Sequence, residues 1–202
     1  MNSFLIFGFG VSGKAAAKLI GQKHKNPTIY AVDQNEISVK GIKQVSPEEA
    51  DGLGFQTAII SPGYQLSKTE KAILKGKTQY TEYEFGFLYL KPHLTIGVTG
   101  TNGKSTVVKM LEWALSKSGK NVVVGGNIGI PICELALQHS TNQLAKNNLV
   151  VVTEISSYQL HYTQSFMFDW GIITNITPDH LAWHSSLQNY IGAKLKLSLI
   201  HI

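Results

Sequence analysis

Short runs of apolar residues recur along the chain, and segments with a helix-like spacing of apolar and polar positions lie between them. The runs are rich in Ile and Val, which is typical of strands that are buried on both faces of a parallel sheet. Strands are therefore predicted over residues 3–7, 28–32, 57–60, 94–98, 121–125, 149–155 and 170–176. Helices are predicted over residues 12–22, 66–75, 82–90, 104–117, 131–138 and 187–197.

The order of these elements predicts an α/β protein with mostly parallel sheets, because strands and helices alternate along the chain. Pro92 ends the helical pattern that precedes it, and a new strand with its own glycine-rich loop follows at once. We therefore predict two domains. A Rossmann-like domain occupies residues 1–92, and a domain built around a phosphate loop occupies residues 93–202.

The composition narrows the class of protein. Apolar residues make up 43% of the chain and charged residues 15%, so the chain can bury a substantial core. The net charge is +5, but the lysines are scattered without a stripe of arginine and aromatic residues, so we expect no nucleic-acid partner. The apolar opening MNSFLIFGFG lacks a basic leader and is too short to span a bilayer, which favours a first strand and no membrane partner. Cys133 is the only cysteine and cannot form an internal disulfide, in keeping with a cytoplasmic protein.

The first glycine-rich loop is GFGVSG at residues 8–13, between a predicted strand and a predicted helix. Its three glycines permit a tight turn and let backbone N–H groups approach a diphosphate at the helix N-terminus. Asp33 closes the second strand, where an acidic residue often accepts hydrogen bonds from a ribose. A dinucleotide such as NAD and a nucleotide-sugar diphosphate satisfy this pattern equally. A glycine-rich turn that only packs the helix on the strand satisfies it too.

The second loop, GVTGTNGKST at residues 97–106, predicts an ATP site. It keeps the last part of the pattern G-x-x-x-x-G-K-[ST], in which Lys104 neutralises phosphate oxygens and the Ser105 hydroxyl binds Mg²⁺. Val98 replaces the first glycine of that pattern. The first loop also matches seven positions, up to Lys14, but Ala15 supplies no hydroxyl. The predicted ATP-binding residues are Gly100, Thr101, Asn102, Gly103, Lys104, Ser105 and Thr106.

Glu154 ends the apolar strand LVVVTE. Because the carboxyl ends of parallel strands meet at one edge of a sheet, this carboxylate is expected beside the phosphate loop. A carboxylate and a hydroxyl are both ligands that Mg²⁺ prefers. The sequence therefore predicts that Glu154 holds Mg²⁺ opposite Ser105.

Four stretches together resemble the Mur ligase family: TGTNGKST at 99–106, GGNIG at 125–129, EISSYQL at 154–160 and NITPDHLAWH at 175–184. EISSYQL discriminates best between members of the family. It resembles the corresponding stretch of the members that join D-glutamate to UDP-N-acetylmuramoyl-L-alanine. The resemblance covers nearly the whole chain, most strongly residues 94–197. It implies an ATP-dependent amide-bond ligase of peptidoglycan precursor synthesis, with ATP and Mg²⁺ as cofactors. It also implies UDP-N-acetylmuramoyl-L-alanine and D-glutamate as partners.

The resemblance further implies roles for individual residues. Asn127 would contact the substrate near its reacting carboxylate, and His180 would bind a second Mg²⁺. Lys194 would be carbamylated, and the added carboxylate would help to bind that second ion. The implied catalytic residues are Lys104, Asn127, His180 and Lys194, and the implied metal ligands are Ser105, Glu154, His180 and Lys194. The residues implied to hold the UDP-substrate are Gly10, Val11, Ser12, Asp33, Ser61, Pro62, Gly63, Asn127 and Ser156.

Two features depart from the family pattern. Ala182 stands where many members have an aspartate after the DHL triplet, which puts a supporting role at that position in doubt. Members of the family are also considerably longer. We therefore expect residues 93–202 to be an incomplete central domain, with the C-terminal amino-acid-binding domain absent. We expect the chain to be a monomer that is inactive alone.

Three alternatives stay open. An NAD-dependent dehydrogenase would use the first loop but would leave the second loop and EISSYQL unexplained. A P-loop kinase or GTPase would use the second loop, although the chain lacks a guanine-specificity motif such as N-K-x-D. A non-catalytic fragment would bind the UDP-substrate and ATP without turning them over.

Overall fold

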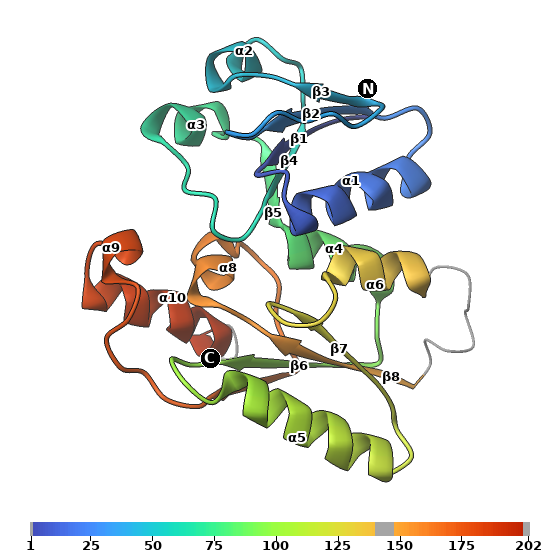
Figure 1. Cartoon of the computed structure of the whole chain (residues 1–202), viewed down its shortest axis with the longest axis vertical. Helices are drawn as coiled ribbons and strands as arrows, with labels where there is room; N and C mark the ends of the chain where they lie inside the picture. The colour runs from blue at the N-terminus through green and yellow to red at the C-terminus, as the bar shows by residue number, and fades with distance from the viewer. Residues whose placement is uncertain (1, 140–147, 200–202) are drawn as a thin grey trace.

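The computed structural model describes residues 2–139 and 148–199, which form two β-sheets with helices around and between them (Figure 1). The first sheet is parallel throughout and has the order β3-β2-β1-β4-β5. Its strands are β1 (Ser3–Phe7), β2 (Thr28–Val32), β3 (Ile42–Gln44), β4 (Thr57–Ile60) and β5 (Thr78–Thr81). The helices of this half are α1 (Val11–Lys23), α2 (Pro47–Asp51), α3 (Lys68–Ile73) and α4 (Glu82–Leu90).

The second sheet is also parallel and has the order β7-β8-β6-β9. Its strands are β6 (Leu94–Thr99), β7 (Asn121–Gly126), β8 (Leu149–Glu154) and β9 (Trp170–Ile173). The helices of this half are α5 (Lys104–Lys117), α6 (Ile132–Gln138), α8 (Ser157–Tyr162), α9 (Leu181–His184) and α10 (Leu187–Leu199). Figure 1 shows α5 along the side of this sheet that faces away from the first sheet, with α4 and α6 between the two sheets.

The central strands are buried because their side chains are apolar on both faces. Every residue of β8 is buried, and so are four of the five residues of β1. The alanines of α1 let that helix lie close to the first sheet, and Ala16 is fully buried there. This packing places the loops that follow β1, β4, β6 and β8 at the carboxyl edges of the two sheets, where ligands bind in open α/β folds.

The contact between α4 and α6 joins the two halves into one continuous core. Gly86 of α4 lies so close to α6 that an added Cβ would come within 2.6 Å of the Ile132 carbonyl carbon. At the start of α4, the buried carboxylate of Glu82 accepts the Cys133 backbone N–H at 2.7 Å. Two residues later, the Glu84 carboxylate accepts the N–H groups of Gln164, Ser165 and Phe166, which fixes the segment that leads into β9.

The α/β class with parallel sheets is confirmed. The predicted boundary at residues 92–93 falls in the loop from α4 to β6, and the division into two domains stays a prediction. The polar strands β3 and β5 were not predicted, and neither were the short helices α2, α8 and α9. The last strand ends at Ile173 instead of residue 176, because the backbone that follows turns toward the second loop. Across the described residues, no helix combines the length and the apolar character that a membrane span requires.

Candidate functional site

A cavity of about 910 Å³ opens at the carboxyl edge of the first sheet, beside the glycine-rich loop. It lies where the strand order reverses between β1 and β4, which is the usual place for a ligand in this fold. Seven of the residues predicted to hold the UDP-substrate line it: Gly10, Val11, Ser12, Asp33, Ser61, Pro62 and Gly63. The structure therefore brings these residues together, and their contact with a UDP-substrate stays a prediction.

The glycine loop is tight because its backbone folds on itself. Gly8 has a φ of +81°, and its carbonyl accepts the Ser61 hydroxyl at 2.6 Å. A Cβ on Gly13 would lie 2.2 Å from that same carbonyl oxygen, so only glycine fits there. Gly10 precedes α1 and has open space around it. The N-terminus of α1 thus faces the cavity, where its N–H groups favour an anion.

Asp33 stands at the end of β2 and supports this loop from the side. Its carboxylate accepts the Phe9 N–H at 2.5 Å and the Asn35 N–H at 2.9 Å. Burial alone would raise the pKa of Asp33, but the hydrogen bonds from Asn35 and Phe9 outweigh it and lower the pKa. The carboxylate is therefore ionised at neutral pH and lines the cavity.

Two residues of this region do not follow from the sequence patterns. Lys14, the last residue of the first loop's partial phosphate pattern, does not line this cavity but a second one on the other side of the loop. Trp183, from α9 in the other half of the chain, does line the first cavity. No local pattern marks Trp183, because its place depends on how the two halves pack.

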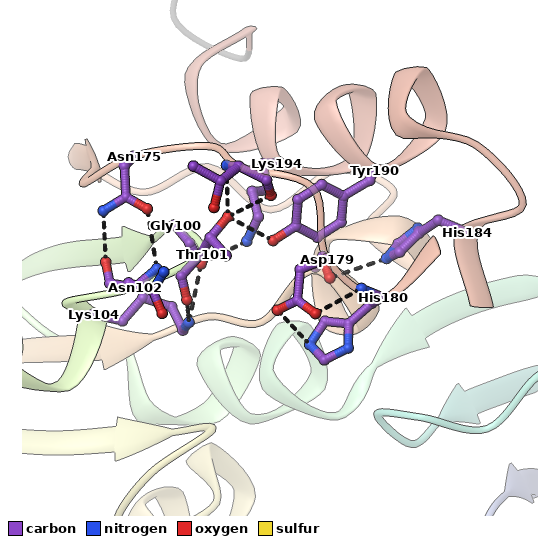
Figure 2. A network of polar contacts seen from close by, with 12 residues as sticks. Gly100, Thr101, Asn102, Lys104, Asn175, Asp179, His180, His184, Tyr190 and Lys194 are labelled. Atoms are coloured by element: carbon purple, nitrogen blue, oxygen red, sulfur yellow. Dashed lines mark hydrogen bonds and ion pairs between the residues drawn. The ribbon is translucent and has the colours of Figure 1, made fainter. Parts of the chain in front are cut away.

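The second glycine-rich loop connects β6 to α5 and has the strand–loop–helix context of a phosphate site. Gly100 has a φ of +147°, and a Cβ there would lie 1.9 Å from the Thr174 hydroxyl oxygen. Gly103, with a φ of +83°, starts α5. Lys104 folds back over the loop and donates to the carbonyls of Gly100 at 3.0 Å and Thr101 at 2.7 Å (Figure 2). The lysine ammonium is thus held where phosphate oxygens would approach.

The segment after β9 forms hydrogen bonds to this loop, as Figure 2 shows for Asn175. The Asn175 side chain accepts the Asn102 N–H at 3.1 Å and donates to the Asn102 carbonyl at 2.9 Å. The Thr101 hydroxyl bonds the Tyr190 hydroxyl at 2.9 Å and donates to the Thr177 carbonyl at 3.0 Å. This outer support lies more than seventy residues away in the sequence and was not predicted.

Glu154 links the second loop to the GGNIG segment. One carboxylate oxygen accepts the Ser105 hydroxyl at 2.7 Å, and the other accepts the Asn127 side-chain amide at 2.8 Å. The Asn127 backbone N–H also donates to the Glu154 carbonyl at 2.8 Å. The structure therefore places these three predicted residues together, and it places Asn127 here and not on the cavity of the first half.

Lys194 is buried on α10 with its ammonium beside the second loop (Figure 2). It donates to the Gly100 carbonyl at 2.7 Å and lies 4.7 Å from the centre of the Tyr190 ring. Burial, followed by the charge of Lys104, lowers the pKa of Lys194 to about 8. The neutral amine form is consequently more populated at Lys194 than at an ordinary lysine.

His180 precedes α9 in a left-handed conformation, with a φ of +52°. Its ring nitrogen lies 3.4 Å from the Asp179 carboxylate, and its ring packs near Tyr158 and Tyr190. The neighbouring His184 is buried, and burial with the adjacent His161 lowers its pKa to about 4. Among residues 2–139 and 148–199, no group of three or more His, Cys, Asp or Glu side chains is arranged to hold a metal.

Ser156 has a structural contact that accounts for its place. Its hydroxyl accepts the Gln159 N–H at 3.3 Å, and the Gln159 side chain accepts the Ser156 N–H at 2.9 Å. This reciprocal pair is a capping box that starts α8. A substrate contact of Ser156 stays a prediction.

Comparison with known proteins identifies relatives of this chain by sequence. Residues 98–199 match the Mur ligase middle domain. The UDP-N-acetylmuramoylalanine–D-glutamate ligase of Pseudothermotoga lettingae is 33% identical over 201 residues, which cover 96% of this chain and 45% of that protein. The ligase of the same name from Streptococcus uberis is 34% identical over 202 residues, which cover 94% of this chain and 43% of that protein.

A solved structure supports the same fold. The murein peptide ligase Mpl of Psychrobacter arcticus has a TM-score of 0.51 and 16% identity over 96% of this chain and 46% of that chain. The chain thus spans less than half the length of the relatives it matches. On the strength of these matches, the chain belongs to the Mur ligase family.

Proposed function

We propose that this chain is the UDP-substrate-binding and ATP-binding part of a ligase that joins D-glutamate to UDP-N-acetylmuramoyl-L-alanine. The activity for which the relatives are named supports this proposal, and so does the presence of two glycine-rich loops in one chain. In the proposed arrangement, residues 1–92 hold the UDP-substrate in the cavity of the first half. Residues 93–202 hold ATP on the loop between β6 and α5.

One observation carries the proposal above the alternatives. The segment from Asp179 to Tyr190 reaches both sites, because Trp183 lines the first cavity while Tyr190 bonds Thr101 of the second loop. A dehydrogenase would need only the first site, and a simple kinase or GTPase would need only the second. A ligase that phosphorylates the far end of a UDP-linked substrate needs both sites side by side.

The residues around Glu154 fit a magnesium ion. The buried carboxylate of Glu154 and the Ser105 hydroxyl supply oxygen ligands of the kind Mg²⁺ prefers, and the Asn127 side-chain NH2 group donates to that carboxylate. When bound, the ion would neutralise charge that develops on the transferred phosphoryl group. Ser105 and Glu154 would hold it, and Lys104 would turn from the loop carbonyls to the phosphate oxygens.

A second magnesium site is proposed at His180 and a carbamylated Lys194. Carbamylation requires the neutral amine of lysine, and the lowered pKa of Lys194 makes that form more available. Carbamylation replaces a cation by an anion, so the ammonium group of Lys104 would no longer be repelled by a second positive charge at the buried Lys194. Asn127 would then lie between the two sites and orient the reacting carboxylate.

The reaction follows from these positions. The terminal carboxylate of the L-alanine residue attacks the γ-phosphorus of ATP, which releases ADP and forms an acyl phosphate. The amine of D-glutamate then attacks the acyl carbon, and the tetrahedral adduct expels phosphate as the amide bond forms. Positioning and charge neutralisation by Lys104 supply the catalysis on this chain.

A ligand-dependent unfolding experiment tests the proposal. The chain is melted with UDP-N-acetylmuramoyl-L-alanine, with NADH, and with ATP and magnesium, each over a concentration series. A ligand that binds only the folded state raises the unfolding temperature by mass action. We expect saturable shifts with the UDP-sugar and with ATP, and none with NADH. A shift with NADH alone would refute the assignment of the first cavity.

A further inference from the structure

The first half contains a second cavity, of about 420 Å³. It lies on the side of the glycine loop away from the cavity of about 910 Å³, which we call the UDP-substrate cavity. One wall is a stripe of α1 formed by Lys14, Ala17, Lys18 and Gly21, which follow one another at helical spacing. The residues that complete the cavity are Phe9, Pro27, Ile29, Val39, Lys40, Gly41 and Ile42. We call this the α1–β3 cavity.

The cavity exists because the connection from β2 to β3 contains no helix. In most parallel sheets a crossover helix covers this part of the face, beside the helix that precedes it. Here residues 33–41 form an irregular connection with a bend and a turn but no helix. The side chain of Gln44 pins that connection, donating to the carbonyls of Asp33 and Asn35 and accepting the Ile37 N–H at 2.8 Å. The opening is therefore preformed and does not depend on a loose loop.

The chemistry of the cavity is divided between its floor and its rim. The floor is apolar and buried, with Phe9 and Ile29 both 5% exposed. Three lysines, which are all exposed, also line the cavity, and the Lys18 ammonium lies 3.8 Å from a Glu134 carboxylate oxygen. In the described part of the chain, no ion pair joins Lys14 or Lys40 to a carboxylate. An apolar pocket beneath two unpaired cations matches an apolar body with one anionic head.

We propose that the α1–β3 cavity binds a small amphipathic anion, with its apolar body on Phe9 and Ile29 and its head between Lys14 and Lys40. This role also accounts for the incomplete phosphate pattern of the first loop. Lys14 follows Gly13 as the lysine of an ATP loop would, yet it lines this cavity and not the UDP-substrate cavity. The same loop thus serves two ligands from its two sides, since the Phe9 ring lies in one cavity and its N–H supports Asp33 in the other.

Gly21 provides a selective test. It lines the cavity, its φ is not positive, and a Cβ there would meet nothing within 4 Å. Gly21→Leu places a bulky apolar group in the opening and favours the helix, because glycine inside a helix costs about 1 kcal/mol relative to alanine. Gly21→Ala gives the same helical benefit without filling the cavity, so it is the matched control.

Octanoate serves as the probe in calorimetric titrations, and octan-1-ol serves as its uncharged counterpart. We expect the unmodified chain and Gly21→Ala to bind octanoate at one site, with a dissociation constant of about 1 mM or tighter. Gly21→Leu should abolish that binding while it unfolds at the same or a higher temperature. The double variant Lys14→Gln and Lys40→Gln should bind octanoate about fivefold more weakly and octan-1-ol unchanged. Equal octanoate affinity in Gly21→Leu, or octan-1-ol affinity equal to that of octanoate, would overturn the proposal.

Discussion

The two glycine-rich loops use the same strand–loop–helix framework but present different chemistry to their sites. The first loop offers backbone N–H groups and the helix end, and its lysine, Lys14, points elsewhere. The second loop offers the side chains of Lys104 and Ser105, supported by Glu154. A diphosphate that is bound without reacting can be held by backbone N–H groups at a helix N-terminus. A phosphoryl group that is transferred needs positively charged groups beside it, because charge develops on it during the reaction. The difference predicts which substitutions affect one site and spare the other.

Gly13→Ala should break the first loop most severely. The new Cβ would lie 2.2 Å from the Gly8 carbonyl oxygen, which also accepts the Ser61 hydroxyl. Overpacking and the loss of that hydrogen bond should together lower the free energy of unfolding by about 4 kcal/mol. Urea unfolding of the variant measures this loss. Gly10→Ala is the control, because open space surrounds Gly10 and its stability should stay within about 0.5 kcal/mol of the original chain.

Glu82→Gln changes a contact between the two halves of the chain, where the Glu82 carboxylate on α4 accepts the Cys133 N–H of α6. Burial raises the pKa of Glu82 to about 7 from its ordinary value of 4.5, so the folded chain binds this proton more tightly than the unfolded chain. The resulting stabilisation is complete below the unfolded pKa and is lost as the pH rises through 7. Between about pH 5 and about pH 8, deprotonation of Glu82 should lower the free energy of unfolding of the original chain by roughly 2.5 kcal/mol.

Glutamine still accepts the Cys133 N–H but does not titrate. The unfolding free energy of Glu82→Gln, measured by urea at several pH values, should therefore lack this part of the decline. If the unfolding free energies of the original chain and of Glu82→Gln changed equally with pH, Glu82 would not titrate in this range.

Lys104→Ala should sharpen the contrast between the loops. Removing a charge-assisted contact to phosphate should weaken ATP binding about 30-fold, which is about 2 kcal/mol. Binding of the UDP-substrate should not change, because Lys104 lies on the second loop. Calorimetric titration with each ligand measures both effects. Lys117→Ala, at the far end of the same helix, should leave both affinities unaltered; a comparable loss there would point to helix stability and not to a phosphate contact.

Val11→Glu is the converse experiment on the first loop. Val11 is 75% exposed at the start of α1, where a glutamate suits the helix but repels a diphosphate. UDP-substrate affinity should fall about tenfold, and ATP affinity should not change. Val11→Gln has nearly the same shape without the charge and should bind almost as the original chain does. If both variants weakened binding equally, the effect would be steric.

The sequence predicted those parts of the site that depend on local patterns. Strand, glycine loop and helix appear in the residue order itself, and Glu154 follows from the rule that parallel strands end at one edge. The polar strand β5 was missed because TQYT has no apolar alternation, and it forms only because β4 offers it a partner. Trp183 and Asn175 were missed because each reaches its site through packing of segments far apart in the chain.

The close approach of Gly86 to α6 has a consequence for how the molecule melts. The aromatic rings of Tyr83 and Phe87 on α4 lie against Phe166 and Phe168, which belong to the other half. If the chain were cut near residue 92, the first piece would expose these rings to water, and the second piece would lose the surface that covers α6. We therefore expect the two halves to unfold as one cooperative unit. A calorimetric scan should show one transition, and both nucleotide sites should disappear at the same temperature.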